Sequence, residues 1–342
     1  MKTPLVSVIL VNFNGLKWLE TCLSSLTNQS YKNIEVVFVD NASSDESISF
    51  VKNNYKKVKI VALKENVGFA GGNNAGLPFC HGTYLCLLNT DTTIEKGYIE
   101  KMIQPFKTDN SLAIAQSKIV LMDKPSIIDT CGSYWTGSTF LYHMGNGKNA
   151  NKGMYNKNQF VFSVKAASVM IRKSVVDEIG LFDSRFWNYY EETDFCHRAM
   201  ISGYSCMYYP SAICYHAGGG TTLSEFNYDY IQFHNFKNKL ASFLKNFDRL
   251  TLVFVLPKFL FLNFVISALW LLTGKWRFSV ALYKAIWWNI SNLKDTFKLR
   301  MTNNRNRVKR DSEYLPAVTR NPQLNYYVAL FTGNFKNYID YE

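Results

Sequence analysis

Short apolar runs alternate with segments of helical periodicity in about the first 110 residues, and this alternation most constrains the fold. Leu5–Val11 is a continuous β-rich run, and the leucines of residues 16–26 then recur at helical spacing. Further strand-like runs follow at Glu35–Asp40, Val58–Leu63 and Tyr84–Leu88. This rhythm predicts an α/β domain with a mostly parallel sheet and helices on both faces.

Polar side chains follow the carboxyl ends of the predicted strands. Because parallel sheets bind ligands at that edge, these side chains are the first candidates for a functional site. They are Asn12 and Asn14, Asp40 and Asn41, Asn66, and Asn89 to Asp91. The first strand is followed by Asn-Phe-Asn-Gly, without the glycine pattern of a dinucleotide-binding turn, and the chain has no Walker sequence.

Two residues are candidate metal ligands. Asp91 comes directly after a buried strand, where a carboxylate could hold Mg²⁺ or Mn²⁺ on a diphosphate, or could simply cap the next helix. His216 follows a strand-like run at 212–215 and precedes three glycines. A lone histidine of this kind is either a ligand or a structural residue.

Three carboxylates lie within four residues at the start of a predicted helix over residues 191–200. Glu191 and Asp194 share a face with Arg198, whereas Glu192 points away from it. Crowding and burial could raise one pKa enough for general-base catalysis. The alternative is a solvated acidic helix start that the helix dipole stabilises.

Together these motifs resemble the inverting family 2 glycosyltransferases of GT-A fold, most of all the rhamnosyltransferase-like enzymes of bacterial surface-polysaccharide assembly. The resemblance covers roughly residues 5–220 and rests on the order and spacing of six motifs. The motifs are Val6–Asn14, Val39–Asp45, Asn66–Gly76, Leu88–Asp91, Tyr190–Arg198, and Tyr208-Tyr209-Pro210 with His216.

The resemblance implies a role for each matching residue. The donor-binding positions would be Asn12, Asn14, Asp40, Asn66, Gly68, Phe69, Asn73, Asn74 and Asn89. Asn89 and Asp91 occupy the outer positions of the family's metal-binding D-x-D, and His216 matches a histidine that completes the metal shell in some relatives. Glu192 falls where the catalytic base sits, with Glu191 and Asp194 as rival assignments. The chain departs from the family pattern at Asn89, a weaker ligand than Asp, and in having Glu-Glu where Glu-Asp is usual.

The implied reaction is a metal-dependent, inverting transfer of a sugar from a nucleotide-sugar donor. dTDP-rhamnose is the first choice of donor, ahead of UDP-sugars, and the acceptor would be a glycan or a polyprenyl-linked sugar. Two other functions remain open: a non-catalytic membrane-bound scaffold of polysaccharide assembly, and a sugar nucleotidyltransferase. The second normally needs a glycine-rich, basic loop after the first strand, which Asn12–Gly15 does not supply.

The formal net charge of +12 is unevenly distributed along the chain. Residues 1–222, the predicted catalytic domain, are close to neutral, and residues 223–342 carry most of the excess. The run Leu250–Leu272 is long enough to span a bilayer. However, Pro257, Lys258 and Asn263 interrupt it, which favours an interfacial or re-entrant helix over a transmembrane one.

The segment after this run combines an apolar stripe with Trp287, Trp288 and many basic residues. This combination is typical of helices that lie on an anionic membrane surface. A helical cap or a homo-oligomer interface is the alternative, and nucleic-acid binding is not expected because no nucleic-acid module accompanies the basic residues.

The cysteines and the N-terminus bear on the compartment. The chain has seven scattered cysteines with no Cys-x-x-Cys pair, as expected in a reducing compartment. Leu5–Val11 ends without a small-residue cleavage site and is predicted to be a strand, not a signal peptide. The expected location is the cytoplasmic face of the cell membrane.

Overall fold

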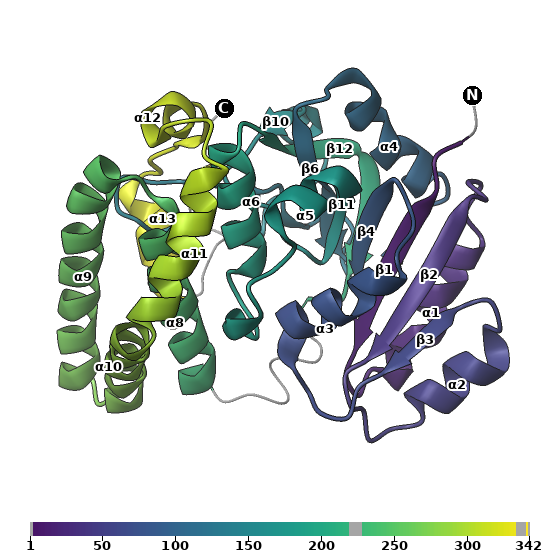
Figure 1. The fold of residues 1–342 in the computed structure, drawn as a ribbon, viewed down its shortest axis with the longest axis horizontal. Helices are drawn as coiled ribbons and strands as arrows, with labels where there is room; N and C mark the ends of the chain where they lie inside the picture. Colours follow the sequence, from purple (N-terminus) through teal and green to yellow (C-terminus); the bar gives the residue numbers. More distant parts are fainter. Residues whose placement is uncertain (1–2, 219–227, 333–339, 341–342) are drawn as a thin grey trace.

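The computed structural model describes residues 3–218, 228–332 and 340, which form a mixed α/β unit with a group of helices beside it (Figure 1). Within this part of the chain, a 10-stranded sheet runs in the order β10-β12-β6-β11-β4-β1-β2-β3, with β5 paired to β12 and β7 paired to β6. Both the α/β class and the C-terminal helical region that the sequence predicts are confirmed.

The N-terminal half of the sheet is parallel, as predicted. Its strands are β1 (Val6–Asn12), β2 (Ile34–Asp40), β3 (Lys59–Ala62) and β4 (Tyr84–Asn89). The elements between and after them are α1 (Leu16–Thr27), α2 (Ser47–Asn54), α3 (Gly68–Gly76), η1 (Leu77–Phe79), β5 (Thr92–Ile94) and α4 (Tyr98–Thr108). All four predicted strands are present, and the carboxyl ends of β1, β2 and β4 meet at one edge.

Beyond β4 the prediction of a mostly parallel sheet is wrong. Strand β11 (Ser168–Arg172) is antiparallel to both β4 and β6 (Leu112–Leu121). A parallel pairing of consecutive strands needs a long crossover connection, which is usually a helix. The connection from β6 to β11 has only short pieces: β7 (Ile128–Thr130), β8 (Ser133–Tyr134), β9 (Tyr142–His143), η2 (Gly153–Asn156) and β10 (Gln159–Phe160). Strand β12 (Ser205–His216) then returns parallel to β6.

Helices cover both faces of the sheet, as predicted. Because side chains alternate along a strand, Val8 and Leu10 of β1 pack on one face with α1 and α4, whereas Ile9 belongs to the other core. The second face is covered by α3, by α5 (Lys173–Ile179) and, after η3 (Ser184–Phe186), by α6 (Glu191–Ile201). Helix α6 therefore begins close to the edge where the parallel strands end (Figure 1).

The C-terminal helices pack against the α/β unit. They are α8 (Tyr228–Asn246), α9 (Arg249–Leu272), α10 (Trp276–Ser291), α11 (Leu293–Arg305), α12 (Asp311–Tyr314), η4 (Leu315–Val318) and α13 (Leu324–Thr332). Phe243 of α8 and Phe247, the residue that follows this helix, lie 5.4 and 5.1 Å from the Trp135 ring, centroid to centroid. The domain boundary expected at residue 222 falls outside the described residues, but the helices that follow it share a core with the α/β unit.

Helix α9 is a single unbroken helix of 24 residues that contains Pro257. Asp248 caps it by accepting a hydrogen bond from the Thr251 amide at 2.8 Å. The two polar residues that interrupt the apolar run have partners: Lys258 donates to the Gly137 carbonyl at 3.1 Å, and buried Asn263 donates to the carbonyl one turn earlier. By length and composition alone, α9 is the one helix among the described residues that could cross a membrane.

Candidate active site

The ends of β1 and β2 form the first part of the site. Asn12 lies opposite Asp40 in the sheet, and its Nδ2 is 3.3 Å from Asp40 Oδ1 and 3.1 Å from Ser43 Oγ. Asn12 Oδ1 is buried and accepts no hydrogen bond from the described residues. A Cβ on Gly15 would lie only 2.3 Å from this oxygen, so a larger residue at position 15 would displace it. An acceptor held this way can take a hydrogen bond from a ligand.

Asn14 secures the turn above this pair. Its side-chain Oδ1 accepts a hydrogen bond from the Ser44 backbone amide at 2.8 Å, and its backbone amide donates to Ser43 Oγ at 3.0 Å. The residue has a positive φ of 49°, which asparagine tolerates better than most side chains. Asn14 therefore holds the Ser43–Ser44 turn against the end of β1, beside Asp40.

A second turn, at Asn66, is held by Asn41. The Asn41 side chain donates to Asn66 Oδ1 at 2.9 Å and accepts from the Val67 amide at 2.9 Å. Gly68 has a φ of +74°, and a Cβ there would lie 2.2 Å from the Trp187 carbonyl oxygen. Only glycine fits where these backbones approach so closely. The sequence placed Asn41 at the strand edge but assigned it no role; its function as the organiser of this turn is visible only in the fold.

Asn73, Asn74 and Phe69 hold α3 in place. The Asn73 side chain donates to the Phe69 carbonyl at 2.9 Å within the helix. Asn74 exchanges hydrogen bonds with the Phe182 backbone, at 2.8 and 3.2 Å, and the Phe69 and Phe182 rings lie 6.1 Å apart. The amide contacts of both asparagines are therefore made within the protein, and they place the start of α3 at the edge.

Asp91 and His216 come together at the ends of β4 and β12. Asp91 does not cap a helix, because the chain enters β5 and α4 begins only at Tyr98. Antiparallel pairing of β5 with β12 sets His216 opposite Thr92 and brings its Nε2 to 3.4 Å from Asp91 Oδ1. Asn89 is half-buried at the end of β4, two residues before Asp91.

The His216 ring is fixed by a residue that the sequence did not suggest, Asp129 of β7. Asp129 Oδ2 lies 2.7 Å from His216 Nδ1, and Lys165 Nζ lies 2.8 and 2.7 Å from the two oxygens of Asp129. Burial alone would raise the pKa of Asp129, but Lys165 and His216 hold it well below its usual range. Burial opposes the charged form of His216, yet its hydrogen bonds to Asp129 and Asp91 raise its pKa.

At the start of α6, Glu191 and Asp194 are buried and Glu192 is half-buried, so the alternative of a solvated acidic helix start is wrong. Burial, and secondarily the charge of Glu192, raises the pKa of Glu191 well above its usual range. Burial raises the pKa of Glu192 to about 7, even though a backbone hydrogen bond and the Lys165 charge act in the opposite direction. The Oε2 atoms of both carboxyl groups have no hydrogen-bond partner among the described residues.

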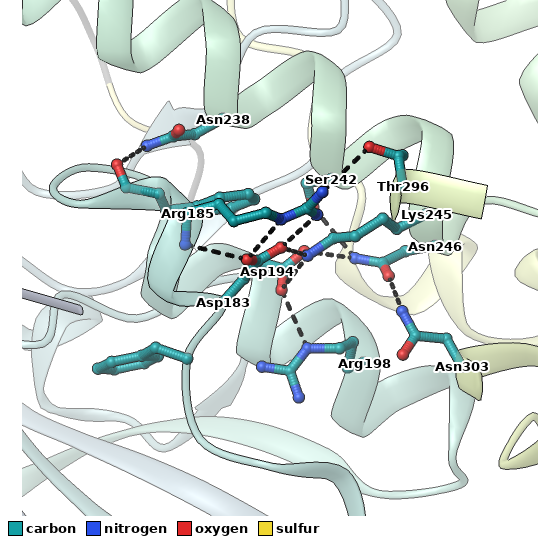
Figure 2. Close-up of polar contacts among 12 residues, drawn as sticks. Asp183, Arg185, Asp194, Arg198, Asn238, Ser242, Lys245, Asn246, Thr296 and Asn303 are labelled. Carbon is teal, nitrogen blue, oxygen red and sulfur yellow. Dashed lines mark hydrogen bonds and ion pairs between the residues drawn. The ribbon is translucent and has the colours of Figure 1, made fainter. Parts of the chain in front are cut away.

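Asp194, the third carboxylate, is bound on all sides (Figure 2). It accepts hydrogen bonds from Arg198 Nε at 2.9 Å and from Asn246 Nδ2 at 2.8 Å, and Lys245 Nζ lies 3.1 Å from the carboxylate. Burial would raise the pKa of Asp194, but Lys245 and Arg198 lower it below its usual value. Lys245 also binds Asp183 at 2.7 Å, so the network joins α6, α8 and the segment before η3.

The residues immediately before the acidic pair have an unusual backbone. Trp187, Tyr189 and Tyr190 have φ values of 64°, 71° and 69°. Each such residue costs about 1–3 kcal/mol unless its surroundings hold it in place. This turn also contacts the Asn66 turn, because the Ala70 amide donates to the Trp187 carbonyl at 3.1 Å. The start of α6 is therefore fixed against the edge of the sheet where β1, β2 and β4 end.

Comparisons with known proteins agree with this architecture. An uncharacterized glycosyltransferase of Haemophilus influenzae is 25% identical over 234 residues, covering 66% of this chain and 69% of its own length. A chondroitin synthase of Escherichia coli is 26% identical over 137 residues, which cover 39% of this chain and 20% of the synthase. A hyaluronan synthase of Pasteurella multocida is 29% identical over 115 residues, or 33% of this chain and 12% of the synthase. The chain thus spans only a small part of the two synthases.

Solved structures share the fold at low sequence identity. GalNAc-T7 with UDP, GalNAc and Mn²⁺ aligns with a TM-score of 0.57 at 14% identity, covering 72% of this chain and 48% of that one. Staphylococcus aureus TarS 1-349 aligns with a TM-score of 0.51 at 16% identity, covering 75% and 70%. The model of the family "Glycosyl transferase family 2" matches residues 7–180, just over half of the chain. The protein therefore belongs to glycosyl transferase family 2.

Proposed function

We propose that the protein transfers a sugar from a nucleotide-sugar donor to a glycan or polyprenyl-linked acceptor, with inversion at the anomeric carbon. One observation carries the proposal: Asp129 and Lys165 link the Asp91–His216 pair to Glu192, whose pKa is raised to about 7. A raised carboxylate pKa close to neutrality suits a general base. The charged groups at the proposed donor-binding edge, where β1, β2 and β4 end, and the proposed base therefore influence each other electrostatically.

In the proposed step, a Glu192 oxygen accepts the proton of an acceptor hydroxyl group, while the oxygen of that hydroxyl group forms a bond to the anomeric carbon. The bond from that carbon to the diphosphate oxygen breaks, and the nucleoside diphosphate departs with the electron pair. One displacement of this kind inverts the anomeric centre. No covalent enzyme intermediate is required.

Glu192 suits the role of base better than its neighbours. Glu191 is only 4% exposed, and burial raises its pKa well above the usual range, which favours its protonated form. Asp194 is fully buried, and its carboxylate is held by Arg198, Lys245 and Asn246. Glu192 alone combines partial exposure with a carboxyl oxygen that has no partner among the described residues.

The donor nucleoside would bind where β1 and β2 end. Asn12, whose buried Oδ1 has no hydrogen-bond partner among the described residues, and Asp40 would contact the base or ribose. The turns of Asn14 and Asn66 would border the nucleotide, with Gly68, Phe69, Asn73 and Asn74 setting their positions and Asn89 near the diphosphate. We propose dTDP-rhamnose or a UDP-sugar as the donor. The chondroitin and hyaluronan synthases among the relatives support a role in polysaccharide synthesis.

Asp91 and His216 fit a divalent cation such as Mg²⁺ or Mn²⁺. A carboxylate and an imidazole Nε2, with Nδ1 held by a second carboxylate, make up a common donor set and its support. No group of three or more His, Cys, Asp or Glu side chains suited to a metal occurs in the described part of the chain, so the diphosphate would have to complete the shell. When bound, the ion neutralises charge on the diphosphate.

The C-terminal helices are proposed to bind the cytoplasmic surface of the inner membrane. Phe254 and Phe261 of α9 are 74% and 67% exposed, and α9 lies at the outer edge of the helical group (Figure 1). Trp287 of α10 is 68% exposed, and basic residues such as Lys275 and Arg277 flank these helices. Exposed apolar side chains beside positive charge suit an anionic lipid surface. A homo-oligomer contact through the same face is the alternative.

The base assignment is tested with Glu192→Gln, which keeps the side-chain volume but removes the proton acceptor. Transfer should fall about 10²–10⁴-fold while donor binding is retained. Glu46→Gln, at an exposed position, is the control and should behave as the wild type. Each protein is assayed against a panel of nucleotide sugars with Mn²⁺ and with EDTA.

Three results would contradict these assignments. Near wild-type transfer by Glu192→Gln would exclude the base assignment, and full activity in EDTA would exclude the metal. If the wild-type protein turns over no donor in the panel, the scaffold function is favoured instead. Formation of a nucleotide sugar from a sugar phosphate and a nucleoside triphosphate would indicate a nucleotidyltransferase.

A further inference from the structure

Helix α8 contributes a buried amide, Asn238, to the turn that precedes the acidic pair. We propose that Asn238 is a positioning residue for Glu192 and that α8 is part of the catalytic unit. The inference rests on the proposed function, because it assumes that Glu192 is the base. It goes further by assigning a role in catalysis to a helix outside the residues that the family model matches.

The side-chain amide of Asn238 contacts a single turn, residues 186–189. Its Nδ2 lies 3.0 Å from the Phe186 carbonyl oxygen, 2.8 Å from that of Asn188 and 2.6 Å from that of Tyr189. Asn238 is fully buried, and its Oδ1 accepts no hydrogen bond from any described residue. Burial of the unpaired Oδ1 costs free energy of folding. The Nδ2 group offsets part of this cost, because its contacts stabilise three neighbouring carbonyl oxygens that would otherwise repel one another.

These carbonyls belong to the turn with positive φ values at Trp187, Tyr189 and Tyr190. A residue other than glycine with positive φ relaxes toward negative φ unless contacts with its surroundings hold it in place. Such a change would rotate the first turn of α6 and move the Glu192 carboxyl group away from the donor edge. Asn238 opposes the change because its protons bind the carbonyls only when they converge.

Other side chains of the same face of α8 hold the segment just before this turn. His234 Nδ1 lies 3.2 Å from the Phe186 carbonyl oxygen, and Lys237 Nζ donates to the Arg185 carbonyl at 2.8 Å. Because residues three and four apart share a helix face, His234, Lys237 and Asn238 act on the turn together. The Asn238 side chain directed at this turn is visible in Figure 2.

Helix α8 also holds α6 on the other side of Glu192. Asn246 and Lys245 bind Asp194, and the Asn246 Oδ1 accepts a hydrogen bond from Asn303 of α11 at 2.7 Å (Figure 2). Glu192 therefore lies between two attachments to one helix, the carbonyls of residues 186–189 and the Asp194 carboxylate. On this basis the catalytic unit extends at least to residue 246, beyond the boundary at 222 that the sequence suggests.

The test compares Asn238→Ala and Asn238→Gln with the wild type. Asn235→Ala is the matched control, because the Asn235 amide donates to the Ile231 carbonyl within α8 at 3.1 Å. In Asn238→Ala we expect kcat to fall about 10–100-fold, since small misplacements of a catalytic group have effects of this size. The dissociation constant of the donor nucleoside diphosphate should stay nearly unchanged, and the apparent pKa of the acidic limb of kcat/KM should shift. Asn238→Gln, which keeps the amide, should recover part of kcat.

A purely structural role would give a different result. Asn238→Ala would then lower the melting temperature but leave kcat per nucleotide-binding site and the pH profile unchanged, and this would overturn the inference. If Asn238→Ala does not fold, the same measurements on Asn238→Gln decide the matter, with wild-type kcat and pH profile as the overturning result. Activity in Glu192→Gln would exclude the proposed base itself. An inactive Glu192→Gln beside a fully active Asn238→Ala would exclude only the positioning role.

Discussion

The proposed role of Glu192 as a base depends on where its carboxyl group lies, not on its residue type. An ordinary glutamate is ionised at neutral pH and is a weak base. Burial at the start of α6 raises its pKa to about 7, and the Lys165 charge limits the rise. Glu191, its neighbour in sequence, is buried more completely, and burial together with the charge of Glu192 raises its pKa well above the usual range. Two adjacent residues of the same type thus differ in pKa mainly through burial.

This difference predicts the pH dependence of the reaction. A base must be deprotonated to accept a proton, so kcat/KM should fall about tenfold per pH unit below an apparent pKa of about 7. Initial rates between pH 5 and 8.5 with a soluble acceptor measure the profile. The residual activity of Glu192→Gln should lack this limb, and the same limb in the variant would assign the titration to another group.

At the scale of single elements, the Asn66 turn and the α6 turn are fitted to each other. Gly68 allows this fit, because a Cβ would meet the Trp187 carbonyl oxygen at 2.2 Å. The contact brings the donor-side turn, held by Asn41, against the turn held by Asn238. Donor binding and base position are therefore expected to respond together when either turn is disturbed.

Gly68→Ala tests this fit against Gly274→Ala. Both glycines have a φ of +74°, but a Cβ on Gly274 would meet no atom within 4 Å. Gly274→Ala should cost about 1–2 kcal/mol of unfolding free energy, from backbone strain alone. Gly68→Ala should cost clearly more and should also weaken donor binding. Urea denaturation and nucleotide titration measure both effects, and equal destabilisation in the two variants would contradict the close approach.

At the scale of the whole molecule, one side of the group of C-terminal helices packs against the α/β unit, and the other side is exposed. Helix α8 faces α6, whereas α9 presents large apolar side chains to the outside. Phe259, in contrast, is buried on the inner side of α9, 5.3 Å from the Phe243 ring. This two-sided arrangement gives α9 a structural contact on one side and leaves its other side free for the proposed contact with lipid.

Membrane binding is therefore expected to depend on the outer face of α9. Phe254→Ser combined with Phe261→Ser should reduce flotation with phosphatidylglycerol vesicles, because exposed apolar area drives interfacial binding. Transfer to a soluble acceptor should be retained. Phe160→Ser, a 50% exposed phenylalanine on β10, is the control. If the wild-type protein stays with the soluble fraction at low salt, the membrane surface is excluded.

Much of the fold could be predicted from local patterns. The strands β1 to β4 and the helices between them follow from apolar periodicity, and Asn12, Asp40 and Asp91 follow from their place at strand ends. The direction of β11 could not be predicted, because no local sequence pattern distinguishes a strand with a parallel partner from one with an antiparallel partner. The continuity of α9 through Pro257 could not be read from the sequence either, since tertiary contacts can outweigh a single helix-breaking residue.

The sequence by itself determined the α/β architecture, the edge that carries the polar residues and the family to which they point, because these depend on periodicity and on spacing within short segments. Only the tertiary structure decided which groups act together. Asp129 reaches His216 across 87 positions, and Asn238 reaches the α6 turn across about 50. Hydrogen bonds and pKa shifts depend on distance in space and on burial, and neither can be read from the order of residues.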